Sequence, residues 1–317
     1  MLNRNLPTVV YHADWGTDPK KRWHCKAVRQ GVSYKVQAPA LVGDHFQLLN
    51  RVKGEVGTTG AAVVGFDFPI GVPAQYATLL GVREFKPLLL ELGLGNFAKF
   101  YDVCRDASQI TKFRPFYPYN YAGIKKQQHL LAALDATHMD QLRRKCDLPH
   151  DGRRAACALF WTLGSNQVGK GTIIGWRDVI APALRGHRPP VLWPFDGCLD
   201  DLLKPGNIVI VETYPAECYG WFFEHGVKSK GELDVREKLA PALLHWAQSA
   251  NVTLDPMLKG TVEAGFPEGD DAFDATVGLF GMLEVLLKRR DSGEPNDESV
   301  RKLEGWILGQ KSASSKR

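Results

Sequence analysis

The sequence predicts an α/β protein with a mixed β-sheet flanked by helices and a large, mainly helical insertion between the fourth and fifth strands. Short β-prone runs fill the first 70 residues, and a further apolar run of strand length lies near residue 210. Helical spacing of apolar residues dominates the chain after that run and most of the segment between the two strand regions. Strand-length and helix-length patterns arranged in this way are typical of a sheet packed against helices.

The first strands are expected to form a meander. Residues 8–13 are β-prone, residues 23–28 alternate between apolar and polar side chains, and residues 32–36 return after a turn that ends at Gly31. Runs of this kind separated by a short turn indicate antiparallel neighbours. Apolar residues at helical spacing then predict a helix over residues 41–52.

Two near-continuous apolar runs predict central strands, because strands that are covered on both faces have no polar side. The first run covers residues 61–68 and has Asp67 near its end, and the second covers residues 207–213 and has Glu212 near its end. The helices expected after these strands cover residues 232–250, 271–290 and about 303–308.

Length and composition favour a globular protein and exclude several other classes. The chain has 317 residues, of which 44% are hydrophobic and 24% charged, and its formal net charge is +5. No apolar run approaches the ~18 residues of a membrane span, and no signal peptide is visible. The six cysteines are scattered without a CxxC pair, which is typical of reduced thiols. We therefore expect a cytoplasmic protein, not a fibre, a membrane protein or a secreted miniprotein.

The charge is unevenly distributed between two predicted regions. Residues 1–75 and 206–317 are expected to form the core, and residues 76–205 the insertion. The insertion contains 18 Lys and Arg against 12 Asp and Glu, whereas the rest of the chain contains 22 against 23. The excess positive charge thus lies in the insertion, as expected for a protein that binds a polyanion.

Four acids occupy positions that such a fold would bring together. Asp14 ends the first strand, Asp67 ends the fourth, and Asp271 and Asp274 open the last long helix on one face. An acid at one strand end is common, but the carboxyl ends of central strands share one edge of a sheet. Carboxylates that converge there repel one another unless a cation binds between them. Their oxygen atoms are ligands that suit Mg²⁺ or Mn²⁺.

Three stretches of the chain resemble a family known as domain of unknown function 429, whose members are predicted to be RNase H-like nucleases. The stretches are GFDFPIGVP at residues 65–73, VETYPA at 211–216 and DAFDA at 271–275. The order of strands and helices looks like the RNase H-like fold, and the acidic helix is similar to that of RuvC-type Holliday-junction resolvases. The resemblance implies metal ligands at Asp14, Asp67, Asp271 and Asp274, with Glu212 nearby.

The resemblance implies a metal-dependent nuclease that hydrolyses phosphodiester bonds of nucleic acid. The five acids just named are then the expected catalytic residues, acting with two divalent ions bound side by side. One departure from RNase H proper is that the first helix offers no well-placed acid, since Glu55 lies just beyond it.

Basic residues before the last long helix are candidate contacts to the substrate. Lys228, Lys230 and Arg236 are placed to neutralise a phosphate group. The alternative interpretation is a solvated loop and helix face, which is at least as common for charged residues at such spacing.

The insertion offers further candidates. Residues 113–121 interleave aromatic side chains with Arg114, and Tyr117 is a candidate for stacking on a base. The alternative is a proline-stiffened arm packed on the core. The glycine-rich residues 164–172 fail the spacing of a P-loop, but Lys170 within them is a candidate phosphate contact.

Two other functions stay open from the sequence. The residues Asp14, Trp15, Gly16 and Thr17 resemble the first phosphate loop of ATP-dependent phosphotransferases of the actin and sugar-kinase type, although no second phosphate loop follows. The third possibility is a non-catalytic nucleic-acid-binding protein, whose binding would be strong, salt-sensitive and independent of metal.

Overall fold

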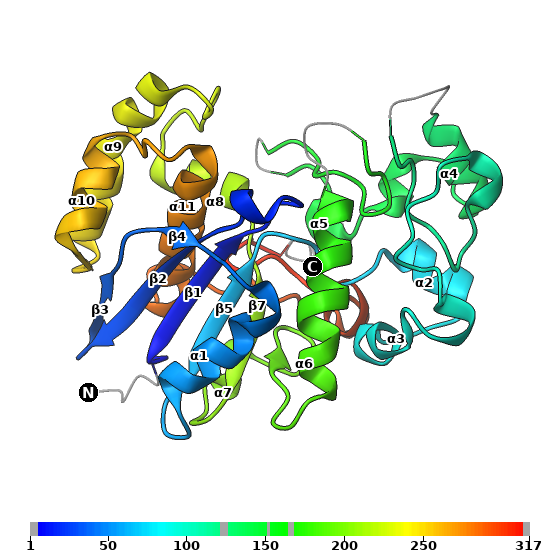
Figure 1. Cartoon of the computed structure of the whole chain (residues 1–317), viewed down its shortest axis with the longest axis horizontal. Helices are drawn as coiled ribbons and strands as arrows, with labels where there is room; N and C mark the ends of the chain where they lie inside the picture. The colour runs from blue at the N-terminus through cyan, green and yellow to red at the C-terminus, as the bar shows by residue number, and fades with distance from the viewer. Residues whose placement is uncertain (1–5, 121–125, 151–152, 164–167, 313–317) are drawn as a thin grey trace.

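A computed structural model describes residues 6–120, 126–150, 153–163 and 168–312 of the chain. The predicted α/β class is confirmed, because an eight-stranded mixed sheet has helices on both faces (Figure 1). The order across the sheet is β6-β7-β5-β1-β2-β3-β8, and β4 pairs with β2. The strands are Val9–Asp14 (β1), Trp23–Gln30 (β2), Ser33–Val36 (β3), Ala40–Leu41 (β4), Ala62–Phe66 (β5), Val191–Leu192 (β6), Ile208–Glu212 (β7) and Thr253–Leu254 (β8).

The α-helices differ greatly in length. The longest are α9 and α11, which have 17 residues each. The α-helices are Leu48–Val56 (α1), Ala74–Leu80 (α2), Phe85–Glu91 (α3), Gln127–Ala133 (α4), Val168–Ile174 (α5), Ala181–Arg185 (α6), Leu199–Leu202 (α7), Pro215–Phe222 (α8), Leu233–Ser249 (α9), Pro256–Glu263 (α10) and Asp270–Leu286 (α11). Among the described residues, none of these helices has both the length and the apolar character needed to cross a membrane.

The centre of the sheet consists of β1, β5 and β7, which run parallel to one another. On its other side β1 pairs with β2 in the antiparallel sense, and β2 pairs with β3 in the same way. In the register of the central pair, Ala13 of β1 lies opposite Phe66 of β5. The residues that follow at the two strand ends therefore emerge next to each other at one edge of the sheet.

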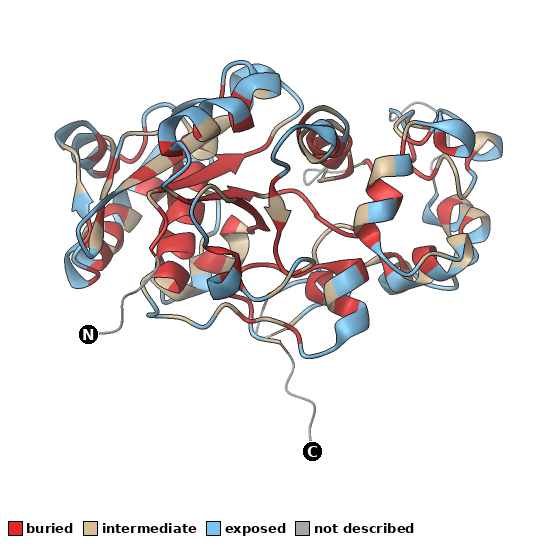
Figure 2. Cartoon of the chain, turned by 90° about the horizontal axis from the view of Figure 1, so that it is seen from below, coloured by how far each residue is buried: buried red, intermediate tan, exposed pale blue. Residues whose placement is uncertain are grey.

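The two faces of the sheet carry separate hydrophobic clusters, because successive side chains of a strand point to opposite faces. Tyr11 and Val64 belong to the cluster under α1, α5 and α6, whereas Val10 and Val63 belong to the cluster under α9, α10 and α11. Figure 2 shows the sheet as a buried layer between helices whose outer surfaces are exposed. Asp14 lies four residues after Val10 in β1, so its side chain points to the same face of the sheet, which is the face covered by α11.

Every strand expected from a long apolar or alternating run is present as β1, β2, β3, β5 or β7, and the expected helices over residues 232–250 and 271–290 are present as α9 and α11. The predicted helix over residues 41–52 begins later than expected, because Leu41 ends β4 and α1 begins at Leu48. The strands β4, β6 and β8 have two residues each and were not predicted.

The described residues of the segment 76–205 form mostly short helices and single 3₁₀ turns. The helices α3, α4 and α7 have only four to seven residues each, whereas a π-helical stretch, Gly175–Ile180, joins α5 and α6 into one continuous helical segment over residues 168–185. The segment also contributes β6, which extends the sheet by pairing with β7. In Figure 1 the helices α2, α3 and α4 lie together to one side of the sheet.

Candidate active site

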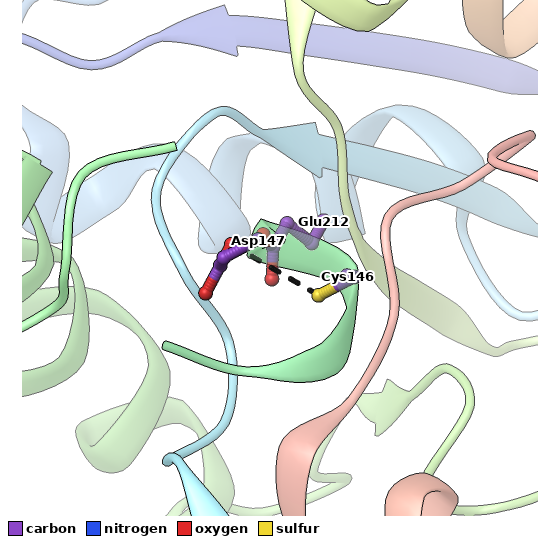
Figure 3. Close-up of side chains that lie close together, drawn as sticks. All are labelled: Cys146, Asp147 and Glu212. Atoms are coloured by element: carbon purple, nitrogen blue, oxygen red, sulfur yellow. Dashed lines mark hydrogen bonds between the residues drawn. The ribbon is translucent and has the colours of Figure 1, made fainter. Parts of the chain in front are cut away.

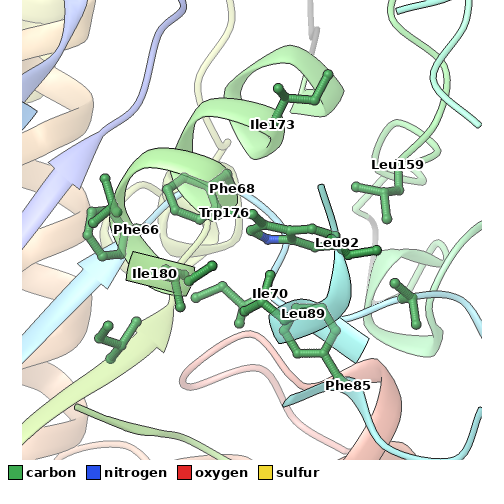
Figure 4. Packing of buried hydrophobic residues seen from close by; sticks show 14 of the residues in the cluster. Phe66, Phe68, Ile70, Phe85, Leu89, Leu92, Leu159, Ile173, Trp176 and Ile180 are labelled. Atoms are coloured by element: carbon green, nitrogen blue, oxygen red, sulfur yellow. The ribbon is translucent and has the colours of Figure 1, made fainter. Parts of the chain in front are cut away.

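The β1–β5 pair places two acids side by side. Asp14 is the last residue of β1, and Asp67 directly follows β5. On either side of Asp67, Phe66 and Phe68 stack on each other at 4.9 Å between ring centres. Figure 4 shows them packed with Trp176. Burial of each phenylalanine contributes roughly 1.5–3 kcal/mol, which fixes Asp67 on the opposite side of the backbone.

The backbone of the turn after β1 also holds Asp67. The amide of Trp15 donates a hydrogen bond of 2.7 Å to Oδ1 of Asp67. The side chains of Asp14 and Asp67 are themselves hydrogen-bonded to each other. The two carboxyl groups therefore form one unit at the end of the central strands.

The helix α11 delivers the other two acids, and glycines allow it to approach the sheet closely. A Cβ atom at Gly278 would lie 2.2 Å from the ring of His12 on β1. His12 Nδ1 and the carbonyl oxygen of Ala275 are 2.9 Å apart. Burial lowers the pKa of His12 to about 4, so the neutral ring donates this bond through Nδ1. The contact fixes the first turns of α11, where Asp271 and Asp274 face the strand ends.

These four aspartates line one cavity of about 530 Å³, which we call the acidic cavity. The charged residues around it are Asp14, Asp18, Asp67, Asp271, Asp274, Lys21 and Lys230. Its wall also includes Trp15, Gly16, Thr17, Phe68, Tyr214 and Tyr219. The structure thus brings together the four acids that the sequence predicted as metal ligands.

The crowded carboxylates hold protons more tightly than isolated ones. Burial and the neighbouring charges of Asp67 and Asp274 raise the pKa of Asp14 well above its ordinary value. Burial raises the pKa of Asp67 to about 6, although the hydrogen bond from Asp14 opposes this shift. The pKa of Asp271 is also raised, first by burial and then by Asp270. A bound cation would reverse these shifts and displace the protons.

Lys230 already supplies one positive charge to the acidic cavity. Its ammonium group pairs with Asp274 and lies 3.8 Å from Asp270. Burial opposes the charged form of Lys230, but Asp274 and then Asp14 raise its pKa above the ordinary value. The hydroxyl of Tyr219 donates to the other carboxylate oxygen of Asp274.

Arg236 holds the loop that carries Lys230. The guanidinium group of Arg236 is buried and donates to the carbonyl oxygens of Lys230 at 2.6 Å and Gly231 at 2.9 Å. It also donates to the carbonyl oxygen of Gly265 at 2.8 Å, in the turn before α11. Arg236 was expected to contact a phosphate, but its donors are used within the protein, so it positions Lys230.

Glu212 does not lie in the acidic cavity. Its carboxylate receives two hydrogen bonds of 2.5 Å from the guanidinium group of Arg144 and one of 2.7 Å from the amide of Ile70. Both charged side chains are buried. The expectation of a catalytic Glu212 is corrected accordingly, because its oxygens are occupied by an internal ion pair.

The same region contains a cluster with the composition of a metal site. The ligand atoms of Cys146, Asp147 and Glu212 lie within 4.8 Å of one another (Figure 3). The guanidinium of Arg144 donates to Asp147 at 2.8 and 2.9 Å as well as to Glu212. Because Arg144 supplies the positive charge between these carboxylates, we assign the cluster a structural role.

The remaining predicted substrate contacts do not line the acidic cavity. Arg114 donates to the carbonyl oxygens of Asp102 and Val103, and Tyr117 is buried with its hydroxyl 2.9 Å from Nδ1 of His129. Lys170 lies on α5 and Lys228 is exposed. The packed-arm alternative describes Arg114 and Tyr117 better than base stacking does.

Residues 121 and 164–167 of the two predicted motifs lie outside the described residues.

Tyr219 and Lys21 line the acidic cavity but were not predicted from the sequence. Tyr219 is the fifth residue of α8, a helix that the apolar pattern did not indicate. Lys21 lies in a 3₁₀ turn, Pro19–Lys21, between β1 and β2. The only available signal was proximity in sequence to the strand ends that carry Asp14 and Glu212.

The donor set of the acidic cavity fits a hard divalent cation. Its ligands are carboxylate oxygens, which Mg²⁺ and Mn²⁺ prefer. Among the described residues, the cluster at Arg144 is the one group in which three ligand atoms lie within 4.8 Å of one another. The four aspartates do not form such a group, and Lys230 pairs with Asp274 among them.

Comparisons of the chain with protein-family models, with curated proteins and with solved structures found no match.

Proposed function

We propose that this protein is a metal-dependent nuclease with an RNase H-like core, which hydrolyses phosphodiester bonds of nucleic acid. The observation that carries the proposal is the convergence of Asp14, Asp67, Asp271 and Asp274 from two strands and a helix around one open cavity. The resemblance of residues 65–73, 211–216 and 271–275 to predicted RNase H-like nucleases supports the same activity.

Each group around the acidic cavity has a part in this proposal. Asp14, Asp67, Asp271 and Asp274 would hold Mg²⁺ or Mn²⁺, which activates water and stabilises the leaving oxygen. Lys230, held by Arg236, supplies a positive charge for the phosphate once its carboxylate partner is taken up by a cation. Residues 76–205 are the proposed insertion into the core.

The test is cleavage of labelled DNA and RNA, single-stranded and duplex, with Mg²⁺ or Mn²⁺ and with EDTA. We expect cleavage by the wild type with either metal, and a loss of at least a hundredfold in Asp67→Asn. The matched control Glu263→Gln alters an exposed carboxylate on α10 and should cut normally. Circular dichroism must show that Asp67→Asn is folded. Undiminished cutting by a folded Asp67→Asn protein would overturn the site.

A second candidate is an ATP-dependent phosphotransferase, and one observation favours it. Trp15, Gly16 and Thr17, which resemble a phosphate loop, line the acidic cavity together with the aspartates. An increase in melting temperature with Mg²⁺ and ATP, in a protein that neither binds nor cuts nucleic acid, would favour this candidate. Metal-independent, salt-sensitive binding of nucleic acid without any cleavage would instead indicate a binding protein.

A further inference from the structure

Two further cavities adjoin the acidic cavity. The second cavity has a volume of about 820 Å³ and shares Tyr214, Ala216 and Tyr219 with the acidic cavity. The third, of about 450 Å³, shares Arg290 and Lys311 with the second. The three cavities adjoin one another at these shared wall residues, and we call them together the track.

The charge along the track changes sign away from the aspartates. The second cavity is lined by Arg154, Arg290 and Lys311, which have no carboxylate partner among the ion pairs of the described residues, and by one carboxylate, Glu224, that also lies outside those pairs. The third cavity adds Asp291. A fourth basic residue there, Arg153, is neutralised by Glu217 at 2.8 Å. An excess of positive charge beside a carboxylate site attracts a polyanion to that part of the surface.

Aromatic rings lie among these cations. The guanidinium of Arg290 lies over the ring of Trp221 at 4.0 Å, and that of Arg153 lies over the ring of Tyr214 at 5.4 Å. Both rings are only partly buried. Partly exposed rings next to cations are the combination that binds single-stranded nucleic acid, where bases stack and phosphates meet positive charge.

We propose that the track binds a single strand of nucleic acid and leads it from Arg290 and Lys311 past Tyr214 to the aspartates. A single strand is favoured over a duplex because the faces of paired bases are covered by their neighbours and cannot stack on these rings. This inference rests on the proposed function, because it takes the aspartates to be the end of the track at which the strand is cleaved.

The test is the binding of a fluorescein-labelled single-stranded 20-mer, measured by anisotropy in EDTA so that no cleavage occurs. We expect the double variant Arg154→Glu/Lys311→Glu to weaken binding at least tenfold and to reduce the slope of log K against log salt by about 1.4. Both residues are exposed, so the fold should be kept. The matched control Arg83→Glu/Lys99→Glu reverses two exposed charges elsewhere and should bind within threefold of the wild type.

A photo-crosslink locates the strand independently of affinity. An oligonucleotide containing 5-iodouracil should crosslink to peptides that contain Tyr214 or Trp221, and a duplex of the same sequence should crosslink and bind much less. Crosslinks confined to other peptides, or equal binding by the duplex, would overturn the proposal.

The outcomes separate the track from the proposed activity. If the wild type cuts nucleic acid with Mn²⁺ but the Arg154→Glu/Lys311→Glu variant binds like the control, the track is wrong and the nuclease stands. If binding depends on these two residues but no cleavage occurs with any metal, the track stands and the nuclease is wrong. Absence of binding by the wild type would overturn the track.

Discussion

Lys230 places a positive charge among the carboxylates of the acidic cavity, where it would compete with the proposed divalent cation. The ammonium group pairs with Asp274, one of the proposed ligands. We expect Lys230→Gln to bind Mn²⁺ about tenfold more tightly at pH 8, a gain of about 1.4 kcal/mol, because the cation no longer displaces a tethered charge. Isothermal titration calorimetry measures this affinity directly.

The control for Lys230 is Lys238→Gln on α9, whose exposed side chain pairs only with Asp234 among the described residues. Its Mn²⁺ affinity should equal that of the wild type. Weaker or unchanged Mn²⁺ binding in Lys230→Gln would show that Lys230 does not compete with the ion.

His24 makes the stability of the protein sensitive to acid. Burial, followed by the charges of Lys26 and Arg51, lowers the pKa of His24 to about 4 from its ordinary value near 6.5. Between these values the unfolded chain binds more protons than the folded one, so stability falls as pH falls from about 6.5 to 4. This group alone should cost about 1–2 kcal/mol between pH 7 and pH 5.

The variant His24→Phe isolates that contribution. Phenylalanine retains a ring to stack on Tyr11, which lies 4.4 Å from His24 between ring centres, but it cannot titrate. In urea unfolding at pH 7 and pH 5, the variant should lose less stability on acidification than the wild type. Equal losses would show that His24 is protonated in the folded protein.

The carboxylates show how far single residues were predictable. Asp14, Asp67 and Glu212 gave the same signal in the sequence, an acid at the end of an apolar strand. The structure uses the first two in the acidic cavity and pairs the third with Arg144. Arg144 is 68 positions away along the chain, so local sequence patterns could not distinguish these cases.

At the level of elements, the packing of α11 on the sheet sets the position of two of the four acids. A Cβ atom at Gly278 would lie 2.2 Å from the ring of His12, which is itself fully buried in β1. We expect Gly278→Ala to destabilise the protein by roughly 1–3 kcal/mol through overpacking. It should also weaken Mn²⁺ binding several-fold, because α11 must move away from β1 to make room.

Gly54→Ala in α1 is the matched control, since a Cβ atom there would have no heavy atom within 4 Å beyond its own helix and chain neighbours. Alanine within a helix should stabilise it by about 0.5–1 kcal/mol relative to glycine. Thermal unfolding and Mn²⁺ titration of both variants test the argument. Wild-type stability in Gly278→Ala would contradict the close packing of α11 on His12.

Elements were predictable where their own residues determine them. The strands β1, β5 and β7 follow from apolar runs that only a central position can bury. The two-residue strands β4, β6 and β8 have no periodic pattern of their own, and they exist because a neighbouring strand offers hydrogen-bonding partners. Their positions depend on tertiary structure, which local patterns do not contain.

At the scale of the whole molecule, one buried guanidinium joins residues 76–205 to the rest of the chain. Arg144 belongs to that segment and contacts Glu212 at the end of β7. It also donates to the carbonyl oxygens of Ile70 and Glu304 at 3.3 Å each. Four distant parts of the sequence therefore meet at a single side chain, beneath the surface that carries the acidic cavity.

Removing this side chain should have a large effect on stability. Arg144→Met leaves the carboxylates of Glu212 and Asp147 buried without a counter-charge, so we expect a loss of about 3–5 kcal/mol in urea unfolding. Arg143→Met is the control, since its partner Asp140 is exposed and the loss of this pair together with the hydrogen bond to the carbonyl oxygen of Ala156 should cost only about 1–2 kcal/mol. In the double variant Arg144→Met/Glu212→Leu, one of the two unpaired buried carboxylates is removed, so part of the lost free energy of unfolding should be restored. The Mn²⁺ affinity of folded Glu212→Gln should stay within twofold of the wild type, because Glu212 lies outside the acidic cavity. An Arg144→Met protein as stable as Arg143→Met would show that the buried ion pair with Glu212 and Asp147 contributes little to stability.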